Sequence, residues 1–330
     1  MVEPSDLVTT VVVNWNGRVH LNKCLSSLLT QTYTPQDIIL VDNGSTDGSA
    51  DYVEAQFPSV KVMRLPVNTG FAAANNLAIR QSSGAHVALL NNDAYAEPDW
   101  LTRLVEAAES DPRVGMCASK MVFAHQPDVL NSTGICVDRA GIAWDRRGGE
   151  ADDDRETQPV EIFGACGGAA LYRRAMLDEI GLFDEDFFAY LEDVDLAWRA
   201  RGVGWRCLYV PAARVYHAHS ATGVEGSPFK SFQLGRNKVW LLAKNYPFKQ
   251  LWMYAPLVAI YDFAAVIYAL VARRDVHALR GRLAGLADVA RIWQKRRGLP
   301  LPQRHDVQWL EPLEVPWRVT RRYRHLAPTR

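Results

Sequence analysis

Four short segments place acidic or amide side chains where a predicted strand ends or a predicted helix begins. In chain order they cover residues 11–17, 41–47, 91–93 and 191–193, and His217 follows them. In open α/β sheets, ligands bind in the crevice outside the carboxyl ends of the strands. The order of these segments therefore predicts an enzyme that uses a nucleotide.

Asp42 and Asp93 each close a predicted strand, so both carboxylates are expected at the same edge of the sheet. Asp42 could accept hydrogen bonds from a base N–H or from ribose hydroxyls, whereas Asp47 suits a turn or a helix cap. Asp93 follows Asn91 and Asn92. Mg²⁺ or Mn²⁺ takes one or two carboxylates together with substrate phosphates and water. Asp93 is therefore predicted to hold a cation that bridges a diphosphate, and a plain turn residue is the alternative.

Glu192 and Asp193 begin a predicted helix that reaches about Gly202. The helix dipole stabilises negative charge at this end, so Asp193 is predicted to stay ionised and to take a proton. Asp195 could pair with Arg199 four residues later and is predicted to be structural.

His217 and His219 alternate after an apolar run. Alternation places them on opposite faces of an extended segment. Only one of them can then be a ligand, and we predict His217. Imidazole suits Mn²⁺ better than Mg²⁺, while a buried structural histidine is the alternative.

Two segments are rich in small residues. Residues 68–76 follow the third predicted strand and contain Asn68, Gly70, Phe71 and Asn75, and residues 164–168 end at Gly168. Small residues let a phosphate or ribose approach the backbone, and a helix N-terminus favours anions. Tight helix packing is the alternative explanation.

The first 125 residues alternate β-branched runs with helix-period stretches, which is typical of βαβ units. The predicted strands cover residues 8–15, 37–41, 60–65, 86–90 and 115–123. They are nearly continuously apolar, as expected when helices cover both faces of a sheet. The predicted fold class is α/β, with a doubly wound, mostly parallel sheet flanked by helices and a C-terminal helical extension. Residues 145–159, which include three consecutive Asp, predict an exposed loop, and a solvated connection is favoured over a mobile lid.

Lys plus Arg and Asp plus Glu number 37 each in the 330 residues, so the net charge gives no reason to expect a nucleic-acid partner. The five cysteines are scattered and show no C-x-x-C spacing, which is typical of reduced thiols. The first residues lack a secretory pattern. We therefore expect a cytoplasmic protein.

The last third of the chain is apolar and then basic. Residues 251–272 are just long enough to span a membrane, but Asp262 at their middle would cost roughly 2.5–3.5 kcal/mol on insertion scales. From residue 273 onward there are 14 Lys or Arg against five Asp or Glu. We expect residues 240–298 to form helices at the inner face of the cell membrane. The alternatives are a helical appendage packed on the rest of the protein or a homodimer interface.

These segments, in this order, resemble family 2 of the inverting glycosyltransferases with the GT-A fold, and in particular its bacterial rhamnosyltransferase-like branch. The resemblance covers about residues 8–237. It implies that the residues contacting the nucleotide sugar are Val13, Asn14, Asn16, Asp42, Asn68, Gly70, Phe71, Asn75, Asn91, Asn92, Gly168 and Arg236. Asn91 stands where the family's Asp-x-Asp motif has its first Asp, and Asp93 matches the metal-binding second Asp.

The resemblance also implies that Glu192 and Asp193 are the acceptor-site acidic pair, with Asp193 as the general base, and that His217 is a metal ligand. It implies Mn²⁺ or Mg²⁺ as cofactor and a dTDP-, UDP- or GDP-linked sugar, rhamnose among them, as donor. A glycan or lipid-linked acceptor in cell-surface polysaccharide synthesis would receive the sugar.

The expected organisation is a catalytic domain at 1–238, with a nucleotide-binding half at 1–125 and an acceptor half at 126–238, followed by a basic helical region at 239–330. One alternative is a catalytically silent sugar-nucleotide-binding protein that acts through a partner. Another is a nucleotidyltransferase, but residues 14–17 are not the Gly-rich basic loop expected after its first strand.

Overall fold

The computed structural model describes residues 7–218, 227–298 and 310–312. Its strands are β1 (Val8–Asn14), β2 (Gln36–Asn43), β3 (Lys61–Leu65), β4 (His86–Leu90), β5 (Ala94–Ala96), β6 (Val114–Phe123), β7 (Gln126–Ser132), β8 (Ile135–Val137), β9 (Ala143–Asp145), β10 (Val160–Ile162), β11 (Ala169–Arg173) and β12 (Arg206–His217). Its α-helices are α1 (Arg18–Leu29), α2 (Ser49–Gln56), α3 (Phe71–Arg80), α4 (Trp100–Glu109), α5 (Arg174–Ile180), α6 (Glu192–Gly202), α7 (Pro228–Asn245), α8 (Phe248–Ala272), α9 (His277–Ala287) and α10 (Val289–Arg297). The five predicted strands and the α/β class are confirmed.

Ten strands form the main sheet, with a path of β10-β12-β6-β11-β4-β1-β2-β3; β5 pairs with β12, and β7 pairs with β6. The half made of β3, β2, β1 and β4 is parallel, as predicted. The other half is mixed, because β11 runs antiparallel to both β4 and β6, and β5, β7 and β10 also pair antiparallel. The pair β6 and β7 must be antiparallel, because only two residues connect these strands and so short a connection can join only antiparallel strands.

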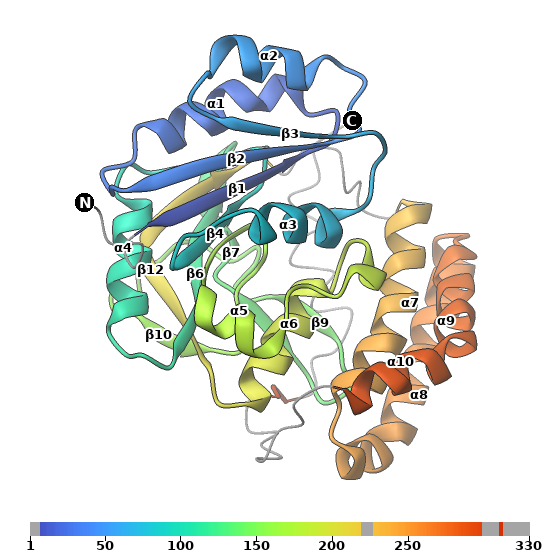
Figure 1. Cartoon of the computed structure of the whole chain (residues 1–330). Helices are drawn as coiled ribbons and strands as arrows, with labels where there is room; N and C mark the ends of the chain where they lie inside the picture. Colours follow the sequence, from blue (N-terminus) through green and yellow to red (C-terminus); the bar gives the residue numbers. More distant parts are fainter. Residues whose placement is uncertain (1–6, 219–226, 299–309, 313–330) are drawn as a thin grey trace.

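Helices cover both faces of the parallel half. Successive side chains of a strand point to opposite faces, so Val11 packs in one core with Ile79 of α3, whereas Val12 packs in the other with Leu25 of α1. Figure 1 shows α1 and α2 on one side of these strands and α3 on the other. This arrangement confirms the doubly wound layer and brings the carboxyl ends of β1, β2 and β4 to one edge.

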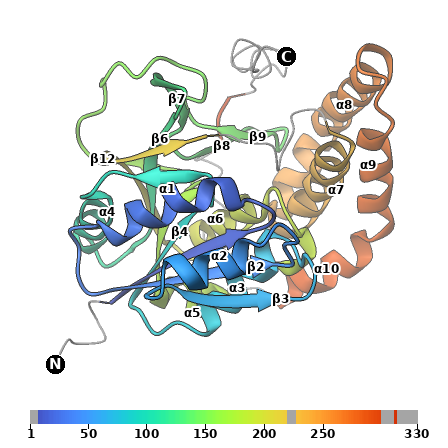
Figure 2. The ribbon, with the colours of Figure 1, turned by 90° about the horizontal axis from the view of Figure 1, so that it is seen from above.

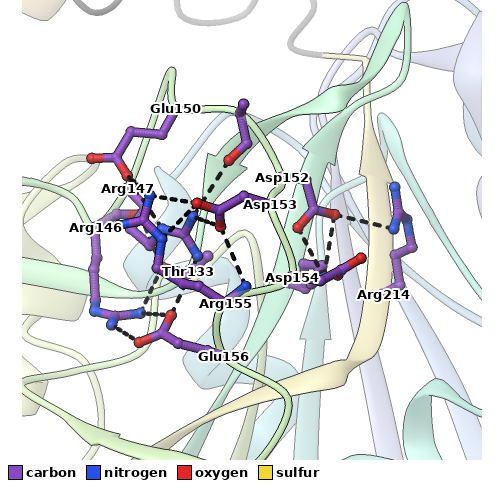
Figure 3. Close-up of polar contacts among 12 residues, drawn as sticks. Thr133, Arg146, Arg147, Glu150, Asp152, Asp153, Asp154, Arg155, Glu156 and Arg214 are labelled. Atoms are coloured by element: carbon purple, nitrogen blue, oxygen red, sulfur yellow. Dashed lines mark hydrogen bonds and ion pairs between the residues drawn. The ribbon is translucent and has the colours of Figure 1, made fainter.

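The acidic loop within residues 145–159 is held in place by ion pairs. The Nζ of Lys120 lies 3.0 Å from Asp152 Oδ1 and 2.8 Å from Asp154 Oδ1, and Arg214 lies 3.2 Å from Asp152 Oδ2. The side chains of Lys120 and Asp152 are each only 6% exposed. A second, separate group of ion pairs and hydrogen bonds comprises Thr133, Arg146, Arg147, Glu150, Asp153, Arg155 and Glu156 (Figure 3). Because a buried charge such as that of Asp152 requires a partner, Lys120 and Arg214 fix the loop at this residue. Most residues from 151 to 159 are exposed, as predicted.

Helices α7 to α10 gather at one side of the molecule in both views (Figures 1 and 2). A Cβ on Gly235 would lie 2.8 Å from the carbonyl oxygen of Ala278, and one on Gly285 would lie 2.8 Å from that of Arg236, so glycines let α7 and α9 approach closely. Helix α7 runs unbroken across residue 238. The predicted boundary between 1–238 and 239–330 therefore falls inside a helix, and the division itself stays a prediction.

Candidate functional site

Three of the predicted segments, residues 11–17, 41–47 and 91–93, meet at the carboxyl ends of β1 and β2. Asn14 and Asp42 are register partners on these strands, and the Nδ2 of Asn14 donates to Asp42 Oδ1 at 3.2 Å. The Nδ2 of Asn92 donates to Asn14 Oδ1 at 2.8 Å. The backbone N–H of Ser45 donates to Asp42 Oδ2 at 3.3 Å. Residues separated by up to 78 positions in the chain thus form one hydrogen-bonded group.

A second group lies beside the first and shapes the loop after β3. The Nδ2 of Asn43 donates to Asn68 Oδ1 at 3.0 Å and to the carbonyl of Gly70 at 3.2 Å. Gly70 has φ +87°, and a Cβ there would lie 2.5 Å from the carbonyl oxygen of Phe188. Both features require glycine. Sequence reasoning missed Asn43, whose position directly after Asp42 was the available signal.

A cavity of about 480 Å³ opens beside the second group and the end of β1. Its lining is Val13, Trp15, Asn43, Asn68, Gly70, Phe71, Phe188, Ala189 and Phe229. Aromatic rings with amide groups among them are typical of sites that bind small organic ligands. Four residues predicted to contact the nucleotide sugar therefore lie at the cavity wall, namely Val13, Asn68, Gly70 and Phe71.

Other predicted contact residues are placed differently. Asn16 accepts a hydrogen bond at 2.8 Å from the backbone N–H of Thr46, which ties the loop after β1 to the loop after β2. Asn75 is 1% exposed, and its Nδ2 donates to the carbonyl of Phe71 within α3. This geometry favours helix packing for Asn75 over the predicted ligand contact. Gly168 accepts from the backbone N–H of Asn91 at 2.9 Å, so these two residues join β4 to β11.

Asp93 and His217, the two predicted metal ligands, lie side by side. The Nε2 of His217 is 3.1 Å from Asp93 Oδ1, and its Nδ1 is 3.0 Å from Asn131 Oδ1. An amide oxygen only accepts, so the assigned orientation of Asn131 requires a proton on Nδ1 and directs the other ring nitrogen toward Asp93. A histidine oriented in this way is typical of a metal ligand. His219, the alternative ligand, lies outside the described residues.

An imidazole nitrogen and a carboxylate oxygen are donors that Mn²⁺ accepts. Among the described residues, no group of three or more His, Cys, Asp or Glu is placed to hold a metal. The pair therefore fits a cation that takes its remaining ligands from substrate phosphates and water.

The acidic pair lies at the first turn of α6. Asp193 accepts from the backbone N–H of Gly167 at 3.0 Å and from that of Val194 at 2.8 Å. Burial raises the pKa of Asp193 despite these hydrogen bonds. Burial, together with the adjacent Asp193, raises the pKa of Glu192, whose Oε2 is buried without a hydrogen-bond partner. Desolvation of Asp193 therefore opposes the predicted stabilisation of its carboxylate by the helix dipole.

The loop before α6 is strained and tightly held. Phe188, Tyr190 and Leu191 have φ between +63° and +71°, a conformation that side chains other than glycine rarely adopt. The Nδ2 of Asn237 donates to the carbonyls of Phe187, Ala189 and Tyr190 at 2.9, 2.9 and 2.7 Å. Backbone strain of this kind persists where surrounding contacts fix it, commonly at functional sites.

Arg236 belongs to the same support. Its Nη2 lies 3.2 and 3.1 Å from the carbonyl oxygens of Asp186 and Phe187, and its guanidinium lies 4.3 Å from the centre of the Trp240 ring. This geometry indicates that Arg236 positions the loop, and it does not favour the predicted contact with the nucleotide sugar.

Asp145 was missed because the sequence assigned it to the exposed loop. In the structure it ends β9 and is half-buried. Burial raises the pKa of Asp145 in spite of a hydrogen bond from Ser132 and the nearby charge of Lys230. Its charge in turn raises the pKa of Asp193. A short strand with one acidic end gives no sequence signal for this proximity.

Comparison with known proteins adds three findings. A model of glycosyl transferase family 2 matches residues 9–181. The N-acetylglucosaminyl-diphospho-decaprenol L-rhamnosyltransferase of Mycobacterium tuberculosis is 31% identical over 240 residues, which cover 66% of this chain and 78% of that protein. An uncharacterized glycosyltransferase of Bacillus subtilis, YwdF, is 28% identical over 219 residues, 66% of this chain and 75% of its own.

Solved structures share the fold at low identity. GalNAc-T7, crystallised with UDP, GalNAc and Mn²⁺, has a TM-score of 0.57 at 18% identity over 72% of this chain and 48% of its own. The mannosyltransferase PcManGT from Pyrobaculum calidifontis, in complex with GDP-Man and Mn²⁺, has a TM-score of 0.52 at 18% identity over 87% of both chains.

Proposed function

Because the chain belongs to glycosyl transferase family 2, we propose that it transfers a sugar from a dTDP-, UDP- or GDP-linked donor to a hydroxyl group, with inversion at the anomeric carbon. The observation that carries this proposal is the acidic pair at the start of α6, where Glu192 is buried. Asp193 accepts from the N–H of Gly167, and the next residue, Gly168, pairs with Asn91, two residues before Asp93. The similarity to the M. tuberculosis enzyme supports L-rhamnose as the sugar and a glycan or lipid-linked acceptor in cell-surface polysaccharide synthesis. Both substrates of such a reaction would be met in the cytoplasm or at its membrane face.

The donor would lie along the ends of β1 and β2. Asp42 would accept from the base or the ribose, while Asn14, itself held by a hydrogen bond from Asn92, donates to its carboxylate. Trp15, which is 42% exposed at the cavity, offers a ring on which a base or a sugar can pack. These contacts select the nucleotide before any chemistry occurs.

Asp93 and His217 would hold a divalent cation, Mn²⁺ or Mg²⁺. When bound, the cation neutralises the charge that develops on the departing nucleoside diphosphate. Asn131 keeps the ring of His217 oriented for this task.

Asp193 would act as the general base. It takes the proton of the acceptor hydroxyl while that oxygen bonds to the anomeric carbon and the bond from this carbon to the diphosphate oxygen breaks. One displacement inverts the anomeric centre. The N–H groups of Gly167 and Val194 hold the carboxylate in position. The proton then resides on Asp193, next to the buried Glu192.

The silent-binder alternative is less well supported. The Oε2 of Glu192 is buried without a hydrogen-bond partner, and such a group destabilises the fold. A protein that only binds a nucleotide sugar does not need this pair, whereas an enzyme that accepts a proton does.

The pH dependence of turnover tests the proposal. Burial raises the pKa of Asp193, so its carboxylate is protonated at a higher pH than an ordinary one, whose pKa is about 3.9. We expect kcat for sugar transfer to fall about tenfold per pH unit on the acid side, with the bend displaced above this ordinary value. Circular dichroism at each pH controls for unfolding. A kcat that stays level down to pH of about 4, with the fold intact, would contradict a buried carboxylate base.

A further inference from the structure

Helix α8 presents a long apolar face to the outside. It has 25 residues, and its most apolar stretch of 18 residues has a mean hydropathy of 2.0, with only 11% of that stretch buried. Trp252, Phe263 and Val271 are 68%, 69% and 76% exposed. The outer face consists of Trp252, Met253, Ile260, Phe263, Ile267 and Val271, which recur at helical spacing and so lie on one side of α8. A contiguous apolar surface of this kind marks an interaction site.

The one charged side chain in the middle of α8 points away from this face. Asp262 lies 3.2 Å from the Nζ of Lys238 on α7 and 2.8 Å from the guanidinium of Arg282 on α9. Its side chain is 20% exposed. The cost that the sequence predicted for placing Asp262 against lipid does not arise, because neighbouring helices neutralise it and the outer face carries no charge.

Basic residues lie at both ends of the apolar face. Lys249 is exposed one turn before Trp252. Arg273 and Arg274 are exposed directly after Ala272, where the helix ends. Cations at the edges of an apolar helix face match the anionic headgroups that surround the acyl chains of a leaflet.

A second copy of the chain fits this surface less well. Antiparallel pairing of two α8 helices would set Lys249 of one copy against Arg273 and Arg274 of the other, and parallel pairing would set like ends together. Both arrangements bring cations together, which costs free energy at an interface. The charges therefore favour an anionic lipid surface as the occupant.

The bundle that carries this face also supports the active site. Phe229, at the start of α7, lines the cavity, and Asn237 of the same helix holds the loop before the acidic pair. A protein seated on a leaflet through α8 would hold its acceptor site at a fixed distance from the lipid. This geometry suits an acceptor whose sugar is attached to a membrane lipid.

We propose that the outer face of α8 lies in the plane of an anionic leaflet, inserted among the headgroups, and seats the enzyme against a lipid-linked acceptor. The exposed apolar face of α8 supports the membrane contact by itself, whereas the link to the acceptor rests on the proposed function. Flotation of the full chain with vesicles of phosphatidylcholine, with or without phosphatidylglycerol, tests the seating. We expect flotation with the anionic vesicles and much less with the neutral ones.

Two double variants test the face and its ends. Trp252→Ser with Phe263→Ser removes two exposed rings and should lower the vesicle partition coefficient by about 100-fold or more. Arg273→Gln with Arg274→Gln should lower it by roughly 30-fold on anionic vesicles. Val19→Ser with Leu29→Ser is the matched control, because these side chains are exposed on α1, and it should float like the wild type.

Three results would overturn the proposal. One is a chain that does not float and stays monomeric in sedimentation. Another is a dimer that Trp252→Ser with Phe263→Ser dissociates, which would assign the face to a second copy. The third is resistance to extraction by high salt and alkaline carbonate, which would indicate a spanning helix. Thermal stabilisation by nucleoside diphosphates, measured on the same samples, separates a failure of the seating from a failure of the donor site.

Discussion

Replacing Asp193 with Asn should lower kcat for sugar transfer by about 10²- to 10⁴-fold, the contribution usual for a positioned general base. The amide is nearly isosteric, but it cannot take a proton from the acceptor hydroxyl. Its oxygen can still accept from the N–H of Gly167 or Val194, which hold the carboxylate in the wild type. Removal of a buried charge also lowers the desolvation cost, so the variant should fold.

Initial rates and donor binding, measured together, check this expectation. The dissociation constant for the donor should stay within a factor of about three, because Asp193 does not contact the nucleotide in the proposed arrangement. Asp178→Asn on the exposed side of α5 is the matched control and should retain wild-type turnover. Unchanged turnover in Asp193→Asn would refute the assignment of the base.

Replacing Lys244 with Met should lower the free energy of unfolding by about 3–5 kcal/mol, as expected when one partner of a buried ion pair is removed. The Nζ of Lys244 lies 2.6 Å from Asp184 and 2.9 Å from Asp195, and the three side chains are 3%, 8% and 0% exposed, respectively. Methionine fills the same space but leaves two buried carboxylates short of a cation. The substitution should also destabilise the position of the acidic pair, because Asp195 lies with Glu192 and Asp193 in the first turn of α6.

The pH dependence of this loss has a defined sign. Burial would raise the pKa of Asp184, but Lys244 and Lys295 outweigh it and lower the pKa to about 2. Lys244 and Arg199 likewise outweigh burial and lower the pKa of Asp195. A lowered carboxyl pKa stabilises the fold above the unfolded value of about 3.9, and this stability is lost as pH falls through the folded pKa.

Urea unfolding at several pH values therefore gives a sharp test. The difference in the free energy of unfolding between wild type and Lys244→Met should be largest near neutral pH. It should shrink as pH falls below about 4, because protonation removes the charge of the unpaired carboxylates. Lys61→Met, at an exposed position on β3, is the control and should change stability by less than about 0.5 kcal/mol. A difference independent of pH would show that Lys244 acts through packing alone.

The parallel half of the fold could be predicted because its signals are local. Apolar β-branched runs mark β1, β2 and β4, and the polar residues that follow them must meet at one edge of a parallel sheet. Asn14, Asp42 and Asn92 are joined there as expected. The pairing of Asp195 with Arg199, a contact between successive helical turns, is likewise confirmed at 2.9 Å.

The rest of the site depends on contacts between distant parts of the chain. Asn237 reaches the loop before α6 across about 50 residues, and Asp145 approaches Asp193 from a three-residue strand. No spacing rule encodes either contact. The ion pairs that anchor the charged loop could not be predicted, because the partners Lys120 and Arg214 lie on strands more than 30 residues away. Arg236 was predicted to contact the nucleotide sugar, but its guanidinium contacts backbone carbonyls instead.

Thermal unfolding with UDP, dTDP and GDP, each with Mn²⁺, Mg²⁺ or EDTA, tests the donor site most directly when wild type is compared with Asp93→Ala. A ligand at 100 times its dissociation constant that binds only the folded state adds about 2.7 kcal/mol, which is readily seen. We expect one diphosphate to stabilise the wild type in a metal-dependent way and to have no such effect on Asp93→Ala. No stabilisation by any diphosphate, or equal stabilisation of Asp93→Ala, would contradict a nucleotide-sugar site built on Asp93 and His217.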